Sequence, residues 1–226
     1  MLPDHLRAVC FDIGGVLVRM PRGPLAEELT DILHADPEQI RRLLVAHGKR
    51  RRNSPRTLAR IVATQCGSTE VDALEAALRL RHRDIATPGF YPDAIPTLEA
   101  LAAAGWRICF LSNAVGDTED RPRPDYYSFA EVVVHSWDIG YCKPEAGAFR
   151  AVEVRMGLAP HEMVNVGDSL RFDVRGATDA GWSAVHLTRL DTPSGAAPSI
   201  SSLLDLPALL PPAPRANQLG AFDGAS

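Results

Sequence analysis

Short apolar runs recur along the chain, and most of them end in a small or polar residue. A short apolar run between turn residues is typical of a strand that is buried on both faces of a sheet. The pattern therefore predicts strands in these segments. They are LRAVCFDI at 6–13, RICFLSN at 107–113, EVVVHS at 131–136, EMVNVGDS at 162–169 and SAVHLT at 183–188.

Segments with helical periodicity separate these strands. The spacing predicts helices over 92–105, 144–157 and 171–181, each closed by a glycine, and one last short helix within 199–210. We expect 116–130 to be a surface loop. Strands that alternate with helices indicate an α/β fold with a doubly wound parallel sheet, whose ligands bind outside the carboxyl ends of the strands.

The stretch between the first predicted strand and Pro92 has no strand pattern. Its helical segments start at Pro, Ser or Thr and end at Gly or polar residues, and they span 24–35, 37–48, 54–67 and 69–84. We predict a small all-helical insert in a larger core. The predicted boundaries are 1–18 and 90–210 for the core, 19–89 for the insert and 211–226 for a disordered Pro/Gly/Ala-rich tail.

Composition narrows the class of protein. The 226 residues are 46% apolar and 23% charged, with a formal net charge of −4, which is typical of a globular protein. The length suits one domain with a small additional element. The basic excess of a nucleic-acid binder is missing, and no apolar run approaches the length of a membrane span. The start of the chain is unlike a secretory signal, so we expect a cytoplasmic protein without nucleic-acid or membrane partners. Oligomeric state does not follow from the sequence.

Cysteine spacing and charge distribution add two further expectations. The four cysteines are scattered without a metal-binding spacing, which predicts reduced thiols. Residues 19–88 hold 13 Lys/Arg and 9 Asp/Glu, whereas the rest of the chain holds 11 and 19. A positive insert is therefore expected over an acidic core.

Carboxylates follow two of the predicted strands. Asp12 can act as a nucleophile that forms an acyl phosphate, which divides a displacement into two steps. Asp168, with Asp173 one helical turn further on, can hold a hard cation at the same edge of the sheet. Mg²⁺ suits such a site because it takes few carboxylates and completes its shell with waters or phosphate oxygens.

Other polar residues can complete this site. Ser112 and the backbone of Asn113 can donate to a phosphoryl oxygen, and Lys143 can balance the phosphoryl charge. Each of these residues alone is more often a helix cap, a turn residue or a surface charge. Their joint occurrence on repeated strand–loop–helix units favours a single site.

Four segments together resemble the haloacid dehalogenase (HAD) superfamily over roughly residues 5–190. They are FDIGGVLV, FLSNA, GYCKPEAGAF and VGDSLRFDVRGATDAGW, in the order of the family signatures. The resemblance implies a Rossmann-like core, with the insert as a cap that sets specificity. It also implies a Mg²⁺-dependent phosphatase that acts on a small phosphorylated metabolite.

The resemblance implies a role for each matching residue. Asp12 would be the nucleophile and a metal ligand, Ser112 a phosphate ligand, and Lys143 the lysine that joins nucleophile and phosphoryl group. Asp168 would bind Mg²⁺, and Asp173 would lie in the first or second shell of the metal.

One position departs from the family pattern. Family phosphatases usually carry DxD in the first signature, and the second aspartate transfers the proton; here it is Gly14. A glycine keeps the backbone carbonyl that binds Mg²⁺ in the family but has no group that transfers a proton. A positioned acid/base typically contributes about 10²–10⁴-fold.

Three consequences of Gly14 are open at this point. The substrate can have a good leaving group, as in a sugar 1-phosphate, and glucose-1-phosphatase-like family members resemble this chain in having glycine here. The proton can come from His34, His47 or His82 of the insert, or from the substrate itself. Alternatively, the protein binds phosphorylated ligands without turning them over.

Two other reactions of the superfamily are less favoured. Dehalogenases work without metal and lack the acidic GDS pattern that is present here at 167–169. Phosphonatases use a cap lysine as a Schiff base, and Lys49 is the lysine of the insert. Its neighbours Arg50, Arg51 and Arg52 also fit a solvated basic loop or attraction of an anionic substrate.

Overall fold

The computed structural model describes residues 2–20, 23–86, 89–118, 123–189, 195 and 197–213. The expected disordered tail falls mostly on 214–226, outside these residues. Pro211, the first residue assigned to that tail, is buried. No helix within the described ranges is both long and apolar enough to cross a membrane.

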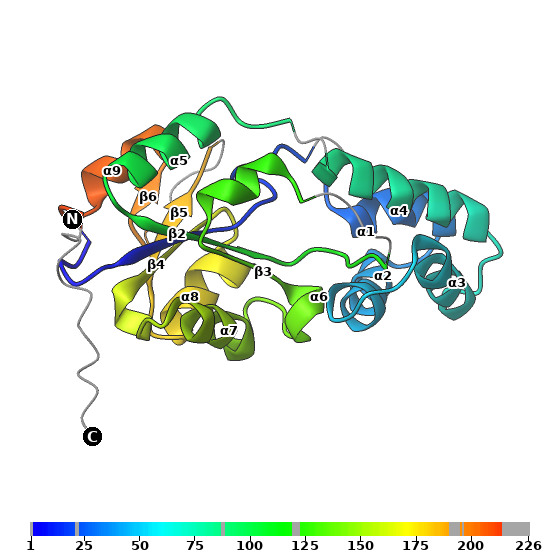
Figure 1. The fold of residues 1–226 in the computed structure, drawn as a ribbon. Helices are drawn as coiled ribbons and strands as arrows, with labels where there is room; N and C mark the ends of the chain where they lie inside the picture. The colour runs from blue at the N-terminus through cyan, green and yellow to red at the C-terminus, as the bar shows by residue number, and fades with distance from the viewer. Residues whose placement is uncertain are drawn as a thin grey trace, which may run out of the picture.

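A parallel sheet forms the centre of the molecule (Figure 1). In the described part of the chain it has six strands in the order β3-β2-β1-β4-β5-β6. All the predicted strands and the α/β class are confirmed, whereas β6 is an extra edge strand, too short to leave a pattern. The strands are β1 Ala8–Phe11, β2 Arg107–Ser112, β3 Val132–His135, β4 Met163–Gly167, β5 Ser183–Leu187 and β6 Ser199–Ile200.

Strand β1 lies between β2 and β4 and is completely buried. In this register Phe11 pairs with Phe110 of β2 and with Val166 of β4. Because every pair in the sheet is parallel, the residues that follow β1, β2 and β4 meet at one edge. This edge is where the polar strand ends of the sequence are brought together.

Helices cover both faces of the sheet (Figure 1). One apolar cluster joins Phe11 and Phe110 to one face, and a second joins Cys10 and Leu111 to the other, because alternate side chains of a strand point to opposite sides. The first face carries α5 (Ala94–Ala103), η5 (Leu203–Asp205) and α9 (Leu206–Leu209), and the second carries α7 (Ala146–Met156) and α8 (Gly176–Asp179).

Several short elements refine the predicted pattern. The helix expected over 171–181 begins as a π-helix, η4, before α8 continues it. The segment expected as a surface loop is partly helical and anchored: Tyr126 is 3% exposed and packs on Phe90 and Phe110. Residues 119–122 of that segment lie outside the described residues. The short elements are η2 Asp125–Phe129, α6 Ser136–Ile139, η3 Pro160–Glu162 and η4 Leu170–Arg175.

The insert forms the four expected helices beyond the carboxyl edge of the sheet (Figure 1). They share an apolar core that includes Leu29, Leu58 and Leu78. The hydroxyl of Ser54 accepts from the Thr57 N–H at 3.1 Å and caps the third helix, as the Ser-Pro start predicts. The elements of this cap are α1 Leu25–Leu33, α2 Pro37–Leu44, the π-helix η1 Val45–Lys49, α3 Pro55–Gln65 and α4 Val71–Ala86.

Two linkers connect the cap to the core, and they run side by side. The Arg19 N–H donates to the Gly89 carbonyl at 2.8 Å, and the Tyr91 N–H donates to the Leu17 carbonyl at 3.0 Å. An antiparallel bridge between Val18 and Phe90 lies between these bonds. The hinge of the cap is therefore a short two-stranded ladder that begins directly after the turn of residues 13–18.

The cap also contacts the core away from this hinge. The Gly116 N–H donates to the Gly48 carbonyl at 2.9 Å. The Arg52 guanidinium lies over the Trp137 ring, 4.0 Å from its centre, and the Trp137 ring lies against Gly116, where a side chain would collide with it. The segment around η1 is thereby held against the loops that follow β2 and β3.

Candidate active site

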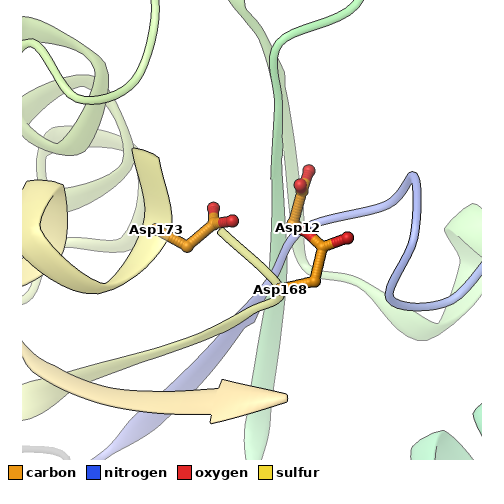
Figure 2. A group of neighbouring side chains, drawn as sticks. All are labelled: Asp12, Asp168 and Asp173. Carbon is orange, nitrogen blue, oxygen red and sulfur yellow. The ribbon is translucent and has the colours of Figure 1, made fainter. Parts of the chain in front are cut away.

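Asp12 lies directly after β1, at the middle of the carboxyl edge of the sheet (Figure 2). Its N–H continues the ladder to the Val166 carbonyl at 3.0 Å, and its carboxylate accepts from the Ile13 N–H at 2.7 Å. The side chain is 16% exposed. The carboxylate is thus fixed by the backbone while one side stays open to a ligand.

Lys143 lies between two of the predicted carboxylates. Its ammonium is 3.1 Å from Oδ1 of Asp12 and 2.6 Å from Oδ1 of Asp173, and its side chain is almost fully buried. Burial alone lowers the pKa of Lys143, but the two carboxylates outweigh it and raise that pKa above its usual range. The lysine is therefore charged at neutral pH, although it is buried.

Asn113 holds the lysine in place through the backbone. The Lys143 N–H donates to Oδ1 of Asn113 at 2.8 Å, and Nδ2 of Asn113 donates to the Lys143 carbonyl at 2.9 Å. Ser112, the last residue of β2, precedes Asn113 and is buried. The side chain of Asn113 is thus engaged with the backbone of Lys143, and binding of a phosphoryl oxygen by the Asn113 backbone stays a prediction.

Both oxygens of Asp173 have partners. Oδ1 is bound to Lys143, and Oδ2 accepts from the Ser169 N–H at 3.0 Å. The side chain also packs against Gly167, where any Cβ would collide with it. The geometry favours a supporting role, in which Asp173 positions Lys143 behind the other two carboxylates.

Asp168 completes an acidic cluster with Asp12 and Asp173, and one oxygen of each lies within 4.8 Å of the others. Figure 2 shows the three carboxylates gathered from the ends of β1 and β4 and from η4. Burial raises the pKa of Asp12 to about 7, against the effect of Lys143, and desolvation raises the pKa of Asp168 to about 6. These shifts mean that it is costly to ionise both carboxylates while Lys143 is the cation between them.

The donor set fits a hard divalent cation. Three carboxylates face one ammonium, so a cation of charge +2 would balance the cluster. Asp12 and Asp168 offer the oxygen ligands that Mg²⁺ prefers, and exposed Asp168 leaves room for waters or phosphate oxygens. The residues present therefore suit Mg²⁺ in number, chemistry and access.

The glycine pair after Asp12 shapes the turn beside this cluster. Gly15 has φ +83°, and a side chain there would collide with the Asp168 carboxylate. A Cβ added to Gly14 would lie 3.3 Å from Sδ of half-buried Met20. The space where the family's second aspartate would project is thus bordered by a flexible thioether, which the sequence pattern did not reveal.

The predicted cap residues differ in their access to the site. His34 ends α1 and lines a cavity with Gly67 and Glu70, at the α3–α4 connection that Figure 1 shows farthest from the sheet. His82 is buried and pairs with Asp117 at 3.0 Å. His47 is half-buried within η1. His34 is thus remote from the site, and His82 is already paired with Asp117.

Lys49 is a half-buried cap cation that interacts electrostatically with the site. Burial lowers its pKa, and the charges of Cys142, Asp12 and Lys143 act on it as well. Its carbonyl accepts from the Cys142 thiol at 3.9 Å, one residue before Lys143. Lys49, the last residue of η1, is therefore not a simply solvated cation, because the charge of Asp12 acts on it.

Comparisons with known proteins agree with this arrangement. A glyceraldehyde 3-phosphate phosphatase of Methanopyrus kandleri is 31% identical over 81% of this chain and 84% of its own length. A phosphoglycolate phosphatase of Shigella boydii is 28% identical, with 82% of both chains covered. The crystal structure of a HAD phosphatase from Thermococcus onnurineus has 26% identity and a TM-score of 0.61, covering 92% of this chain and 99% of that one.

The family description "haloacid dehalogenase-like hydrolase" matches residues 6–181, which is most of the chain. The match includes the strands β1 to β4 and the whole cap. The expected superfamily and the expected enzyme class, a phosphatase, are confirmed. The chain belongs to the haloacid dehalogenase-like hydrolases.

Proposed function

We propose that the protein is a Mg²⁺-dependent phosphatase that hydrolyses a small phosphorylated metabolite through an aspartyl-phosphate at Asp12. The observation that carries the proposal is the ammonium of Lys143 between Asp12 and Asp173, beside open Asp168. The Lys143 ammonium contacts Asp12 and is held in place by the buried carboxylate of Asp173. This geometry suits transfer of an anionic group to Asp12.

The reaction has two displacements. An Asp12 oxygen attacks phosphorus, the bond from phosphorus to the leaving oxygen breaks, and that oxygen departs with the electron pair. Water then attacks the phosphorus, the bond to Asp12 breaks and inorganic phosphate leaves. Lys143 balances the charge in both steps, and Ser112 with the Asn113 N–H binds a phosphoryl oxygen.

Mg²⁺ would be held by Asp12, Asp168 and the Gly14 carbonyl. When bound, it supplies charge neutralisation that allows the anionic nucleophile to approach the anionic phosphoryl group. Asp173 supports the site by fixing Lys143 and by accepting from the Ser169 N–H.

Gly14 restricts the substrate. The first displacement needs a proton on the leaving oxygen unless that oxygen is a stable anion, and Gly14 offers none. We therefore propose a substrate with a good leaving group, such as a sugar 1-phosphate. The rival function is binding of a phosphorylated ligand without turnover. The absence of a carboxylate at position 14 favours this function as well.

A graded panel separates these functions. Phosphate esters of increasing leaving-group pKa are assayed with Mg²⁺, together with the Asp12→Asn variant. Rates that fall steeply with leaving-group pKa are expected. Equal rates for simple alkyl phosphates would instead indicate a proton donor in the cap. Ligand binding without any Asp12-dependent turnover would favour the rival. A phosphonate and a haloacid in the panel test the less favoured reactions.

A further inference from the structure

Arg189 lies outside the site residues described so far, yet it reaches the turn that follows the nucleophile. It comes two residues after the end of β5. Its Nη2 donates to the Val16 carbonyl at 2.7 Å, and its Nε donates to the Gly15 carbonyl at 3.4 Å. One guanidinium thus holds two consecutive carbonyls of the glycine turn.

The guanidinium is itself held by a buried carboxylate. Nη1 and Nη2 of Arg189 bind the two oxygens of Asp93 at 2.9 and 3.0 Å. Asp93 also accepts from the Ser202 hydroxyl at 2.9 Å and from the Leu203 N–H at 2.8 Å. Such a two-pronged pair fixes the plane of the guanidinium, which a lysine would not do.

The same guanidinium contacts the hinge of the cap. It lies over the Tyr91 ring, 3.7 Å from the ring centre. The Tyr91 N–H in turn donates to the Leu17 carbonyl at 3.0 Å. Arg189 therefore joins the glycine turn to the returning linker of the cap.

The turn needs an external anchor. Two successive glycines have more backbone freedom than any other pair of residues. The Gly15 N–H donates to the Val18 carbonyl, and its carbonyl is left for Arg189. The Gly15 N–H lies in the same planar peptide unit as the Gly14 carbonyl, so its bond to Val18 orients that carbonyl, and Arg189 fixes the next peptide unit through the Gly15 carbonyl.

We propose that Arg189, oriented by Asp93, is a positioning residue that holds the Gly14–Gly15 turn so that the Gly14 carbonyl and Asp168 share one cation. This inference rests on the proposed function, because it assigns a purpose to the geometry of the predicted Mg²⁺ site. An ordinary structural ion pair would stabilise the fold without affecting the cation.

The test is metal binding without substrate. Mn²⁺ binding to Arg189→Met, Arg189→Lys and Asp93→Asn is measured by isothermal titration calorimetry, together with urea unfolding of each variant. Arg107→Met is the matched control, since Arg107 also pairs with a carboxylate, Glu131, and donates to a carbonyl, at the opposite edge of the sheet. In turnover assays of the Arg189 variants we expect kcat to fall by a larger factor than KM changes.

Arg189→Met and Arg189→Lys are expected to bind Mn²⁺ at least about tenfold more weakly, as is typical when a residue that orients metal ligands is lost. Arg107→Met should lose stability and keep its Mn²⁺ affinity. If Arg189→Met does not fold, the Mn²⁺ affinities of Arg189→Lys and Asp93→Asn test the inference, and both should be lowered. Unchanged Mn²⁺ affinity in the folded Arg189 variants would overturn the inference alone. A wild-type protein that binds no Mn²⁺ would overturn the proposed metal dependence together with it.

Discussion

A missing side chain at position 14 governs proton transfer in the proposed reaction. Gly14→Asp restores a carboxylate next to Asp12, and we expect it to raise turnover of simple alkyl phosphates by about 10²-fold or more. The new Cβ would meet Met20 at 3.3 Å, and an unbranched thioether can move aside. Initial rates on a graded series of esters measure the effect.

Gly14→Asn is the control for this substitution, because the amide has the same shape but cannot act as a general acid. It should disturb Met20 equally and leave alkyl phosphates unreactive. An equal gain in both variants would show that bulk, and not proton transfer, limits the reaction.

Lys143 is expected to stabilise the metal-free fold in addition to binding the phosphoryl group. Lys143→Met leaves Asp12 and Asp173 next to each other without a cation, which should cost about 3–5 kcal/mol of unfolding free energy near neutral pH. The loss should shrink as pH falls from 7 to 5, because Asp12, whose pKa is about 7, becomes protonated and the repulsion is removed. Urea unfolding at both pH values tests this, and a loss that does not depend on pH would contradict it.

The residues at the strand ends could be predicted because each follows an apolar run and the parallel topology brings such ends together. Asp12, Ser112 and Asp168 are examples, whereas Lys143 lies between α6 and α7. Met20 and Arg189 could not, since their roles depend on how the chain leaves for the cap and how it continues after β5. A polar residue just beyond the β5 run was the available signal for Arg189, but that run lacked a carboxylate and drew no site prediction.

At the scale of elements, strong periodicity predicted the sheet and the four cap helices. The elements that were missed are those with little pattern of their own. Strand β6 has two residues, and the helix η2 is fixed by Tyr126 packing on Phe110, a tertiary contact. Helical periodicity also could not orient the cap, so the position of Lys49 relative to Asp12 required the structure.

The orientation of η1 gives a prediction for the cap. The charges of Asp12 and Lys143 act on Lys49, so we predict that its ammonium binds an anionic or polar part of the substrate. Lys49→Met should raise KM by about tenfold or more, by loss of one charged hydrogen bond. We also predict that Lys49, whose pKa is lowered by burial, donates a proton to the leaving oxygen, so that in Lys49→Met kcat falls further for esters with poor leaving groups than for esters with good ones.

Arg79→Met is a suitable control for Lys49→Met, because Arg79 is an exposed cap cation that pairs with Glu75. It removes the same charge from the cap while leaving the contacts around η1 intact. If both variants raise KM equally, general attraction by the positive cap, and not a contact from Lys49, would explain the result.

At the scale of the whole molecule, stability and metal binding are linked through the acidic cluster. The pKa of Asp12 is raised to about 7 and that of Asp168 to about 6 in the folded protein, from 3.8. Between about pH 4 and 7 the folded state therefore holds more protons than the unfolded state. The unfolding free energy of the metal-free protein should fall as pH rises through this window, as far as these groups determine it.

Mg²⁺ should reverse this trend, because it binds the ionised carboxylates and competes with protons. Its stabilising effect is expected to be small near pH 5 and large near pH 8, measured as the shift in urea midpoint with and without Mg²⁺. Burial raises the pKa of Asp93, but Arg189 and its other partners outweigh burial and lower that pKa. The stability that Asp93 contributes is therefore lost only as pH falls below about 4. The contribution of Asp93 can thus be told apart from that of the acidic cluster by pH alone.

In Asp168→Asn the Mg²⁺ effect should disappear, and the metal-free protein should be more stable than the wild type at pH 8. A stabilising effect of Mg²⁺ that persists in this variant would place the cation elsewhere.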